Sequence, residues 1–181
     1  NFSLKTSLGK FEASSVVVAA GGYSMPGIGA SGFGFDIARS FGLKVLPTNA
    51  ALVPFLWTKK DSALFVQLAG IALPCKITCD GMTFDESFLF THKGLSGPAI
   101  LQISSYWKLG QSVSIDLLPE VADDFLLQAK KHSPAKKLKQ IIAPHFPKRF
   151  VELAVAQWAA DKRPLGQIPE KQLIDISAKF K

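Results

Sequence analysis

The chain has 181 residues, of which 48% are hydrophobic and 19% charged, a composition typical of a folded globular protein and not of a disordered one. No apolar stretch reaches the roughly 18–20 residues needed to cross a membrane, and the first residues have neither the charged start nor the apolar centre of a signal peptide. The net charge of +7 is uneven, because residues 1–129 carry 9 Lys+Arg against 10 Asp+Glu whereas residues 130–181 carry 12 against 4.

Residues 1–50 are predicted to form a strand, a turn, a helix and a further strand. Alternation over Leu4–Leu8 predicts a strand that ends at the Gly9-Lys10 turn. The β-branched run Ser15–Ala20 is typical of a strand buried on both faces of an α/β sheet. After a glycine-rich loop, the pattern predicts a short helix over 35–41 with Gly42 as its C-terminal cap, and a strand over 44–46.

Residues 51–118 change to β character, with frequent turns. Pro54 interrupts the apolar run 51–57, which predicts an edge or bent strand. Asp80-Gly81 is a strong signal for a two-residue hairpin turn between two short strands. Further short strands are expected over 64–68, 71–73 and 113–117, so this stretch predicts a small barrel or partly open sheet. One helix interrupts it, with Ser96 as its cap and Pro98 in its first turn.

Residues 119–181 are predicted to be a small helical bundle. Four prolines mark the expected helix starts, namely Pro119, Pro134, Pro147 and Pro169. Lysines fall mainly on the polar faces of these helices. The excess of positive charge therefore has two interpretations: a surface that meets nucleic acid or an acidic protein, or simply the solvated face of the helices.

The only two cysteines are Cys75 and Cys79, which share one face if residues 75–79 are a strand. A metal site would require more soft ligands nearby, so we expect no metal and two buried, reduced core thiols.

The segment Gly27–Gly32 matches the dinucleotide-binding pattern G-x-G-x-x-G, although a single match is a weak signal. Residues 23–26 separate it from the preceding strand, and no acidic residue follows at the ribose-binding distance, so it is not the primary phosphate fingerprint. Glycines before a helix still expose backbone N–H groups to an anion or an electron-rich ring. A tight crossover between sheet and helix is the alternative.

A second group of polar residues lies within Phe88–Pro98, where Thr91, His92, Lys93 and Ser96 are close in sequence. A hydroxyl, an imidazole and an ammonium near a helix start could bind an anionic or carbonyl-bearing ligand. Alternatively, Thr91 and His92 only satisfy the backbone of a turn. No carboxylate can be placed beside His92, so no Ser/His/Asp arrangement and no catalytic base is assigned.

Taken together, four stretches carry a family resemblance: Val16–Gly22, Pro26–Ala38, Ala51-Leu52-Val53-Pro54 and Phe90–Leu101. They resemble the BaiN/YhiN-type NAD(P)/FAD-dependent oxidoreductases of bacteria, a family with aminoacetone-oxidase-like members. The likeness is clear over about residues 15–118 and loose over the remaining helices. The order and spacing of the motifs make it specific.

The resemblance implies an α+β protein in several parts. Residues 1–50 would be part of an FAD-binding α/β lobe (strand, glycine loop, helix), residues 51–118 an inserted β-barrel-like module, and residues 119–181 a helical subdomain. The cofactor-binding residues implied are Ala20, Gly21, Gly22, Gly29, Ala30, Ser31, Gly32 and Gly34. Thr91, His92 and Ser96 are the candidates for the substrate side. Ala20 stands where the family has a threonine, which removes one hydroxyl from the cofactor contact.

The resemblance further implies an enzyme that uses FAD in a cytoplasmic bacterial protein, with NAD(P)H as an electron donor and a small-molecule substrate. The chain lacks an initiator Met and the N- and C-terminal parts of the FAD lobe, so alone we expect it to be inactive and not to hold FAD tightly. No membrane and no specific nucleic-acid partner is expected. The alternative function is a basic interaction module that binds nucleic acid or an acidic partner without catalysis.

Overall fold

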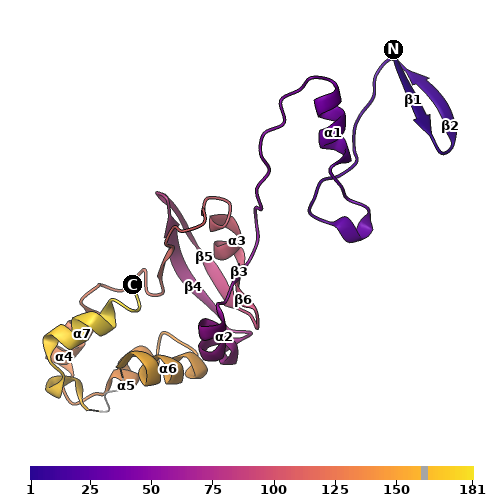
Figure 1. The fold of residues 1–181 in the computed structure, drawn as a ribbon. Helices are drawn as coiled ribbons and strands as arrows, with labels where there is room; N and C mark the ends of the chain where they lie inside the picture. The colour runs from indigo at the N-terminus through magenta and orange to yellow at the C-terminus, as the bar shows by residue number, and fades with distance from the viewer. Residues whose placement is uncertain (160–162) are drawn as a thin grey trace. The chain divides into compact units, whose positions relative to one another are not determined.

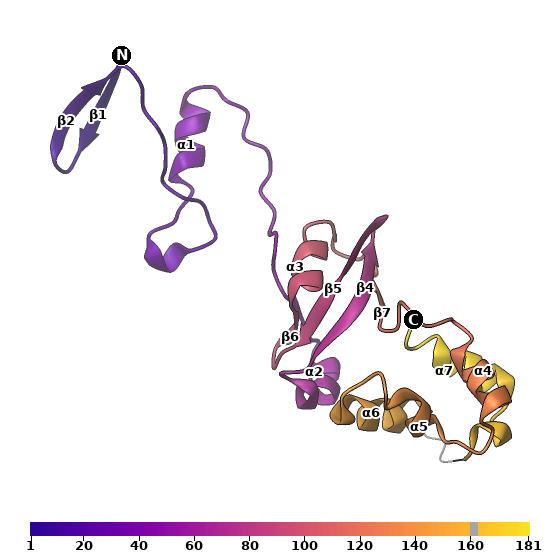
Figure 2. The ribbon, with the colours of Figure 1, turned by 180° about the vertical axis from the view of Figure 1, so that it is seen from behind.

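The computed structural model describes residues 1–159 and 163–181, which divide into two compact units. The first unit comprises residues 1–49 and the second residues 50–181. Figures 1 and 2 carry the α and β labels used below. Each unit is described by itself.

The first unit begins with an antiparallel hairpin and contains one regular helix. Strands β1 (Phe2–Thr6) and β2 (Gly9–Ala13) pair from Phe2↔Ala13 to Thr6↔Gly9, so the turn is Ser7-Leu8, two residues before the predicted position. Helix α1 (Phe33–Ser40) follows a 3-10 turn, η1 (Pro26–Ile28). Gly42, with φ 74°, ends α1: its N–H donates to Arg39 O, and the next N–H donates to Ala38 O. This is the predicted glycine cap.

The strands predicted over 15–20 and 44–46 are not formed, because both segments are irregular backbone. A strand of a parallel sheet exists only through hydrogen bonds to its neighbours, and the described residues offer these segments none. The β-branched side chains are consequently exposed, with Val17 at 89%. For this chain by itself, the prediction of strands over 15–20 and 44–46 was therefore wrong.

The second unit contains a five-stranded antiparallel sheet with the order β3-β6-β5-β4-β7. Its strands are β3 (Phe55–Leu56), β4 (Ala72–Cys79), β5 (Met82–Phe90), β6 (Gly94–Ser96) and β7 (Ser114–Asp116). The expected hairpin turn joins β4 to β5, where Asp80 (φ 51°) and Gly81 (φ 76°) take the two left-handed positions of the turn. The Pro54 interruption correctly marks β3 as an edge strand.

Two short helices pack with this sheet. Helix α3 (Pro98–Ile103) contacts β4 and β5, and both ribbon views place it beside that central hairpin (Figures 1 and 2). Its cap is Gly97, one residue after the predicted Ser96, with Pro98 in the first turn as expected. The strand predicted over 64–68 is instead helix α2 (Lys59–Phe65) followed by the 3-10 turn η2 (Val66–Leu68). Thr58 accepts from the Asp61 N–H and starts that helix.

The remaining residues are mainly helical, as predicted. The helices are α4 (Phe125–His132), α5 (Leu138–Ile142), α6 (Lys148–Ala154) with a π-helical continuation η3 (Val155–Ala159), and α7 (Glu170–Ser177) after the short turn η4 (Leu165–Gln167). Pro147 and Pro169 directly precede their helices. The helix expected at Pro119 begins six residues later, at Phe125, because residues 119–124 form turns.

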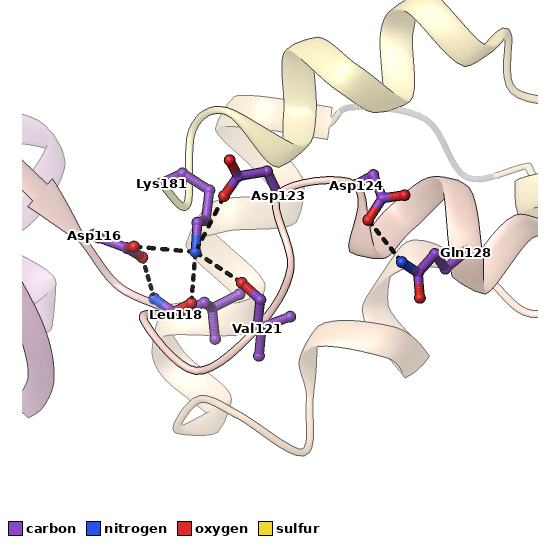
Figure 3. Close-up of polar contacts among 7 residues, drawn as sticks. All are labelled: Asp116, Leu118, Val121, Asp123, Asp124, Gln128 and Lys181. Carbon is purple, nitrogen blue, oxygen red and sulfur yellow. Dashed lines mark hydrogen bonds and ion pairs between the residues drawn. The ribbon is translucent and has the colours of Figure 1, made fainter.

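One polar cluster ties the end of the helical part to the loop after β7 (Figure 3). The Lys181 ammonium lies 3.0 Å from Asp116 Oδ2 and donates to Leu118 O at 2.7 Å and Val121 O at 2.8 Å. Asp123 adds a longer ion pair of 3.5 Å. The backbone reinforces this connection, since the Leu117 N–H donates to Phe180 O at 2.8 Å.

Every fully buried hydrophobic side chain of the described chain lies between Leu68 and Phe180, so the core belongs to the second unit. The buried set runs continuously from the sheet (Leu73, Ile77) to the helices (Leu126, Phe150). The α+β fold class, with a curled sheet and several helices, is therefore confirmed. Whether residues 51–118 and 119–181 are separate modules stays a prediction.

Candidate functional site

The two predicted cofactor segments, 20–22 and 29–34, contact each other within the first unit. A Cβ placed on Gly34 would lie 3.5 Å from Val18 Cγ1 and 4.0 Å from Gly21 O, so the first turn of α1 packs on the end of the valine run. A Cβ on Gly21 would lie 3.8 Å from that of Ala30. Ala20 and Gly22 flank Gly21 in the same irregular segment. The small residues therefore permit a close approach between backbone segments.

The loop that precedes α1 leaves several backbone donors accessible. The Ala30 N–H donates to Met25 O, and the Ser31 hydroxyl accepts from the Phe33 N–H at 3.3 Å. Within residues 1–49, the N–H groups of Gly32 and Gly34 meet no protein acceptor. Gly29, with φ 90°, takes a conformation that favours glycine. Such a loop can donate hydrogen bonds to an anion at the start of a helix.

Gly32 also makes room for an aromatic side chain. A Cβ at Gly32 would come within 2.6 Å of the Tyr23 hydroxyl, and the Tyr23 ring stacks on Phe35 at 5.2 Å between centroids. Tyr23 therefore covers the start of α1 from the side of the loop.

The three substrate-side candidates come together in the second unit. Thr91, His92 and Ser96 line one hollow of about 350 Å³, together with Pro54, Phe55, Leu56, Lys93 and Gly94. Its walls are β3, the turn between β5 and β6, and β6 itself. The surface of the hollow is mostly apolar, and His92 and Lys93 are the ionisable residues that line it.

The Thr91 hydroxyl is occupied by the turn itself. It donates to Gly94 O at 2.9 Å and accepts from the N–H groups of Lys93 at 3.2 Å and Gly94 at 3.0 Å. Thr91 therefore holds the shape of the turn and has no free polar group for a ligand. These contacts agree with the alternative interpretation, in which Thr91 satisfies the backbone of the turn.

His92 and Lys93, in contrast, are exposed at the tip of the turn, and within the described ranges 1–159 and 163–181 neither side chain has a hydrogen bond or a carboxylate partner. Both also line a second hollow of about 480 Å³ with Leu56, Trp57 and Lys59. The half-buried Ser96 hydroxyl is likewise without a protein partner. These three groups are therefore available to a ligand.

The pairing of β3 with β6 positions the hollow. Leu56 lies opposite Gly94, and a Cβ at Gly94 would overlap Phe55 O, so glycine is required there. The Trp57 N–H donates to Lys93 O at 2.9 Å and its indole N–H to Thr91 O at 3.3 Å. The Trp57 ring stacks with Phe65 and Phe90, which fixes the turn against the core. Sequence reasoning missed this role of Trp57 and Leu56, since strand pairing across 38 residues leaves no local signal.

The cysteines behave as core residues. Cys75 is fully buried and Cys79 is 3% exposed, both thiols are free, and they alternate with buried Ile77 along β4. Burial, followed by the charges of Asp85 and Asp116, raises the pKa of the Cys75 thiol from 9.0 to about 11. No group of three or more His, Cys, Asp or Glu that could hold a metal occurs among the residues that the structure describes. In the same residues, no helix has both the length and the apolarity needed to span a bilayer.

Comparison with curated proteins gives relatives that cover most of the chain. It is 49% identical over 166 residues to a ribosomal RNA dihydrouridine synthase of Escherichia coli, and 42% identical over 180 residues to one of Haemophilus influenzae. A 3-dehydro-bile acid delta(4,6)-reductase of Clostridium scindens is 28% identical over 157 residues. These alignments cover 91%, 97% and 78% of the chain, but only 40%, 45% and 38% of the three relatives. The chain thus spans less than half the length of the relatives that it matches.

The family model for the HI0933-like protein barrel and H2TH domain matches residues 49–181, which are the second structural unit with one preceding residue. The curled sheet and the helices after it agree with a barrel followed by a helical part. The chain belongs to the HI0933-like barrel and H2TH domain family.

Proposed function

We propose that this chain is part of a BaiN/YhiN-type flavoenzyme that reduces uridine to dihydrouridine in ribosomal RNA. The observation that carries the proposal is the 49% and 42% identity to two proteins named as ribosomal RNA dihydrouridine synthases. The second alignment covers 97% of the chain, so it includes both the glycine-rich segment and the His92 hollow.

The relatives' names share one reaction class. Dihydrouridine differs from uridine by two hydrogens across a C=C bond that is conjugated to a ring carbonyl. A delta(4,6)-reductase acting on a 3-dehydro bile acid also reduces C=C bonds conjugated to a carbonyl. In such a reduction a hydride adds to the β carbon and a proton to the α carbon. We therefore propose conjugate reduction as the chemistry, with uridine as the substrate here.

The residues of the first unit fit one edge of an FAD site. The free N–H groups of Gly32 and Gly34 and the left-handed Gly21 and Gly29 form a loop that a negatively charged or electron-rich group can approach closely. Ala20, Gly22, Ala30 and Ser31 would complete that edge. Reduced FAD supplies a hydride to such substrates, with NAD(P)H as the proposed source of electrons.

The exposed valine run is consistent with the same proposal. Val17 is 89% exposed and Val18 is 47% exposed. Such exposure is unusual for consecutive β-branched residues. In an assembled FAD lobe this segment would be a sheet strand with neighbours on both sides. Because Gly21 and Gly34 lack a Cβ, the end of the valine run and α1 already lie close together.

The His92 hollow fits the substrate side of this reaction. An apolar floor of Pro54, Phe55 and Leu56 suits the flat face of a base, and the exposed His92 and Lys93 can donate hydrogen bonds to a carbonyl or phosphate oxygen. Ser96 offers a further hydroxyl. Thr91 would not contact the substrate but would hold His92 and Lys93 at the tip of the turn.

The test measures dihydrouridine in ribosomal RNA treated with the intact flavoprotein, FAD and NADPH, by nucleoside mass spectrometry. We expect the double variant His92→Gln, Lys93→Gln to lower product formation about tenfold or more, since the charge-assisted hydrogen bond from Lys93 alone contributes about 1.5–3 kcal/mol. Lys108→Gln, which removes an exposed charge outside the hollow, should leave product formation unchanged. A colourless wild-type protein that forms no dihydrouridine would contradict the proposal.

A further inference from the structure

The whole net charge of the chain resides in one segment of 27 residues. Residues 125–151 contain seven of the 21 Lys and Arg residues and no Asp or Glu. The rest of the chain therefore carries 14 basic and 14 acidic residues and is neutral, while this acid-free segment carries +7. It begins with α4, includes α5 and ends within α6.

Three of the seven cations have structural contacts. Lys130 donates to Ile168 O at 2.7 Å, Lys139 lies 3.9 Å from Glu152, and Arg149 donates to Gln67 O at 3.2 Å. The other four side chains are exposed and, across residues 1–159 and 163–181, have no carboxylate within ion-pair distance; they are Lys131, Lys136, Lys137 and Lys148.

The loop that carries Lys136 and Lys137 is held firmly. The carbonyls of Pro134 and Lys136 accept from the N–H groups of Gly166 and Leu165, each at 2.8 Å, and Lys137 forms a β-bridge with Pro164. A Cβ at Gly166 would lie 3.1 Å from Pro134 Cβ, so the two loops are in contact. The loop between α4 and α5 is therefore a fixed platform and not a free linker.

The helices of this segment are anchored in the core. Phe125 and Leu126 of α4, Leu138 and Ile142 of α5, and Phe150 of α6 are all buried in one core. Lys131 lies on α4 and Lys148 on α6, while Lys136 and Lys137 lie in the loop between α4 and α5. An acid-free segment that presents four exposed cations in this way attracts a polyanion.

We propose that Lys131, Lys136, Lys137 and Lys148 bind the phosphate backbone of folded ribosomal RNA and hold it for the reaction. The identification of the polyanion as ribosomal RNA rests on the proposed function. The aromatic residues of the segment favour backbone contacts over base stacking, since Phe125, Phe146 and Phe150 are 8%, 7% and 1% exposed. Recognition of single-stranded bases would require exposed aromatic rings.

The experiment measures binding of the intact flavoprotein to protein-free bacterial ribosomal RNA over a range of salt concentrations. The test variant changes Lys131, Lys136, Lys137 and Lys148 to Gln. The control variant removes the same charge from four other exposed lysines that lack a carboxylate partner, Lys5, Lys10, Lys60 and Lys171. Circular dichroism and thermal melting confirm that both variants are folded.

We expect the test variant to bind RNA at least about tenfold more weakly and to flatten the slope of log K against log salt by about 3, the value for four lost phosphate contacts. The control variant should bind within about twofold of wild type, since its lysines make no phosphate contact. Equal binding and equal slopes for the two variants would overturn the proposal. So would polyglutamate that displaces the RNA from the wild type as well as an equal charge of competing RNA does.

Dihydrouridine analysis on the same proteins separates this proposal from the proposed function. If the wild type binds RNA through the four lysines but forms no dihydrouridine, the surface is supported and the reaction is wrong. If dihydrouridine forms equally well with the test variant at limiting RNA, the reaction is supported and the surface is wrong.

Discussion

Cys75 illustrates how a single side chain responds to burial. The folded protein favours its protonated thiol, because the pKa is raised from 9.0 to about 11 by burial and by the charges of Asp85 and Asp116. A neutral thiol among Ile77 and the residues of β4 behaves as a small hydrophobic group. At neutral pH we therefore expect no reaction of Cys75 with thiol reagents in the folded state.

The same shift predicts a pH dependence of stability. Because the folded pKa lies above the unfolded one, the folded state retains the proton longer, so this contribution is complete below pH 9.0 and is lost as the pH rises through 11. The loss is about 1.4 kcal/mol per pH unit. The test is urea unfolding of wild type and Cys75→Ala: their difference in unfolding free energy should be constant below pH 9.0 and decrease between 9.0 and 11. A difference that stays constant over the whole range would contradict this.

Lys181 connects two elements that are far apart in sequence, the loop after β7 and the end that follows α7 (Figure 3). Its side chain is 16% exposed and that of Asp116 is 22% exposed, so this ion pair is poorly screened by water. Asp123 is 90% exposed and contributes little. Most of the effect should therefore come from Asp116 and from the carbonyls of Leu118 and Val121.

We expect Lys181→Met to lower the free energy of unfolding by about 1–3 kcal/mol, because it removes the cation beside the partly buried Asp116 carboxylate and the donor to Val121 O. Lys179→Met is the matched control, since the exposed Lys179 ammonium makes a single hydrogen bond to the residues that the structure describes, of 3.3 Å to Trp158 O. Asp123→Ala should also have little effect. If Lys181→Met and Lys179→Met are equally stable in urea, the connection has no energetic role.

Elements that the sequence predicted correctly were those determined by local chemistry. Asp80-Gly81 forms the expected turn because both positions need positive φ, and Pro147 and Pro169 begin helices because a missing N–H costs nothing there. Elements that depend on distant partners were not predictable. Residues 15–20 lack strand neighbours, and the apolar run 64–68 became helical because the Thr58 cap decided between two patterns.

The candidate site shows the same division. Thr91, His92 and Ser96 are close in sequence, so their grouping in one hollow was predictable. The contribution of Pro54 to Leu56 was not, because it arises from the pairing of β3 with β6. The commitment of the Thr91 hydroxyl to the turn likewise depends on the conformation of Gly94.

At the scale of the whole molecule, the two units differ in what holds them together. The buried core lies entirely within residues 68–180, whereas residues 1–49 have no fully buried hydrophobic side chain. Burial of apolar surface is the main stabilising term in folding. The second unit therefore has what it needs to fold by itself, and the first does not.

We predict that a protein comprising residues 50–181 alone unfolds cooperatively, with the same urea midpoint as the 181-residue chain. Residues 1–49 alone should show no cooperative transition, because a hairpin and one helix without a core are marginal. Circular dichroism during urea titration measures both. A transition of residues 1–49 alone, or a second unit that does not fold, would refute this division of stability.

Both native thiols are covered by the sheet and helices, so a cysteine introduced at the surface would be the one that a spin label reaches. Ser7, in the turn of the first hairpin, and Ala135, in the loop between α4 and α5, are exposed positions suited to such labels. Pulsed electron resonance on the doubly labelled intact protein would then follow the distance between the glycine-rich unit and the lysine surface as flavin and RNA are added.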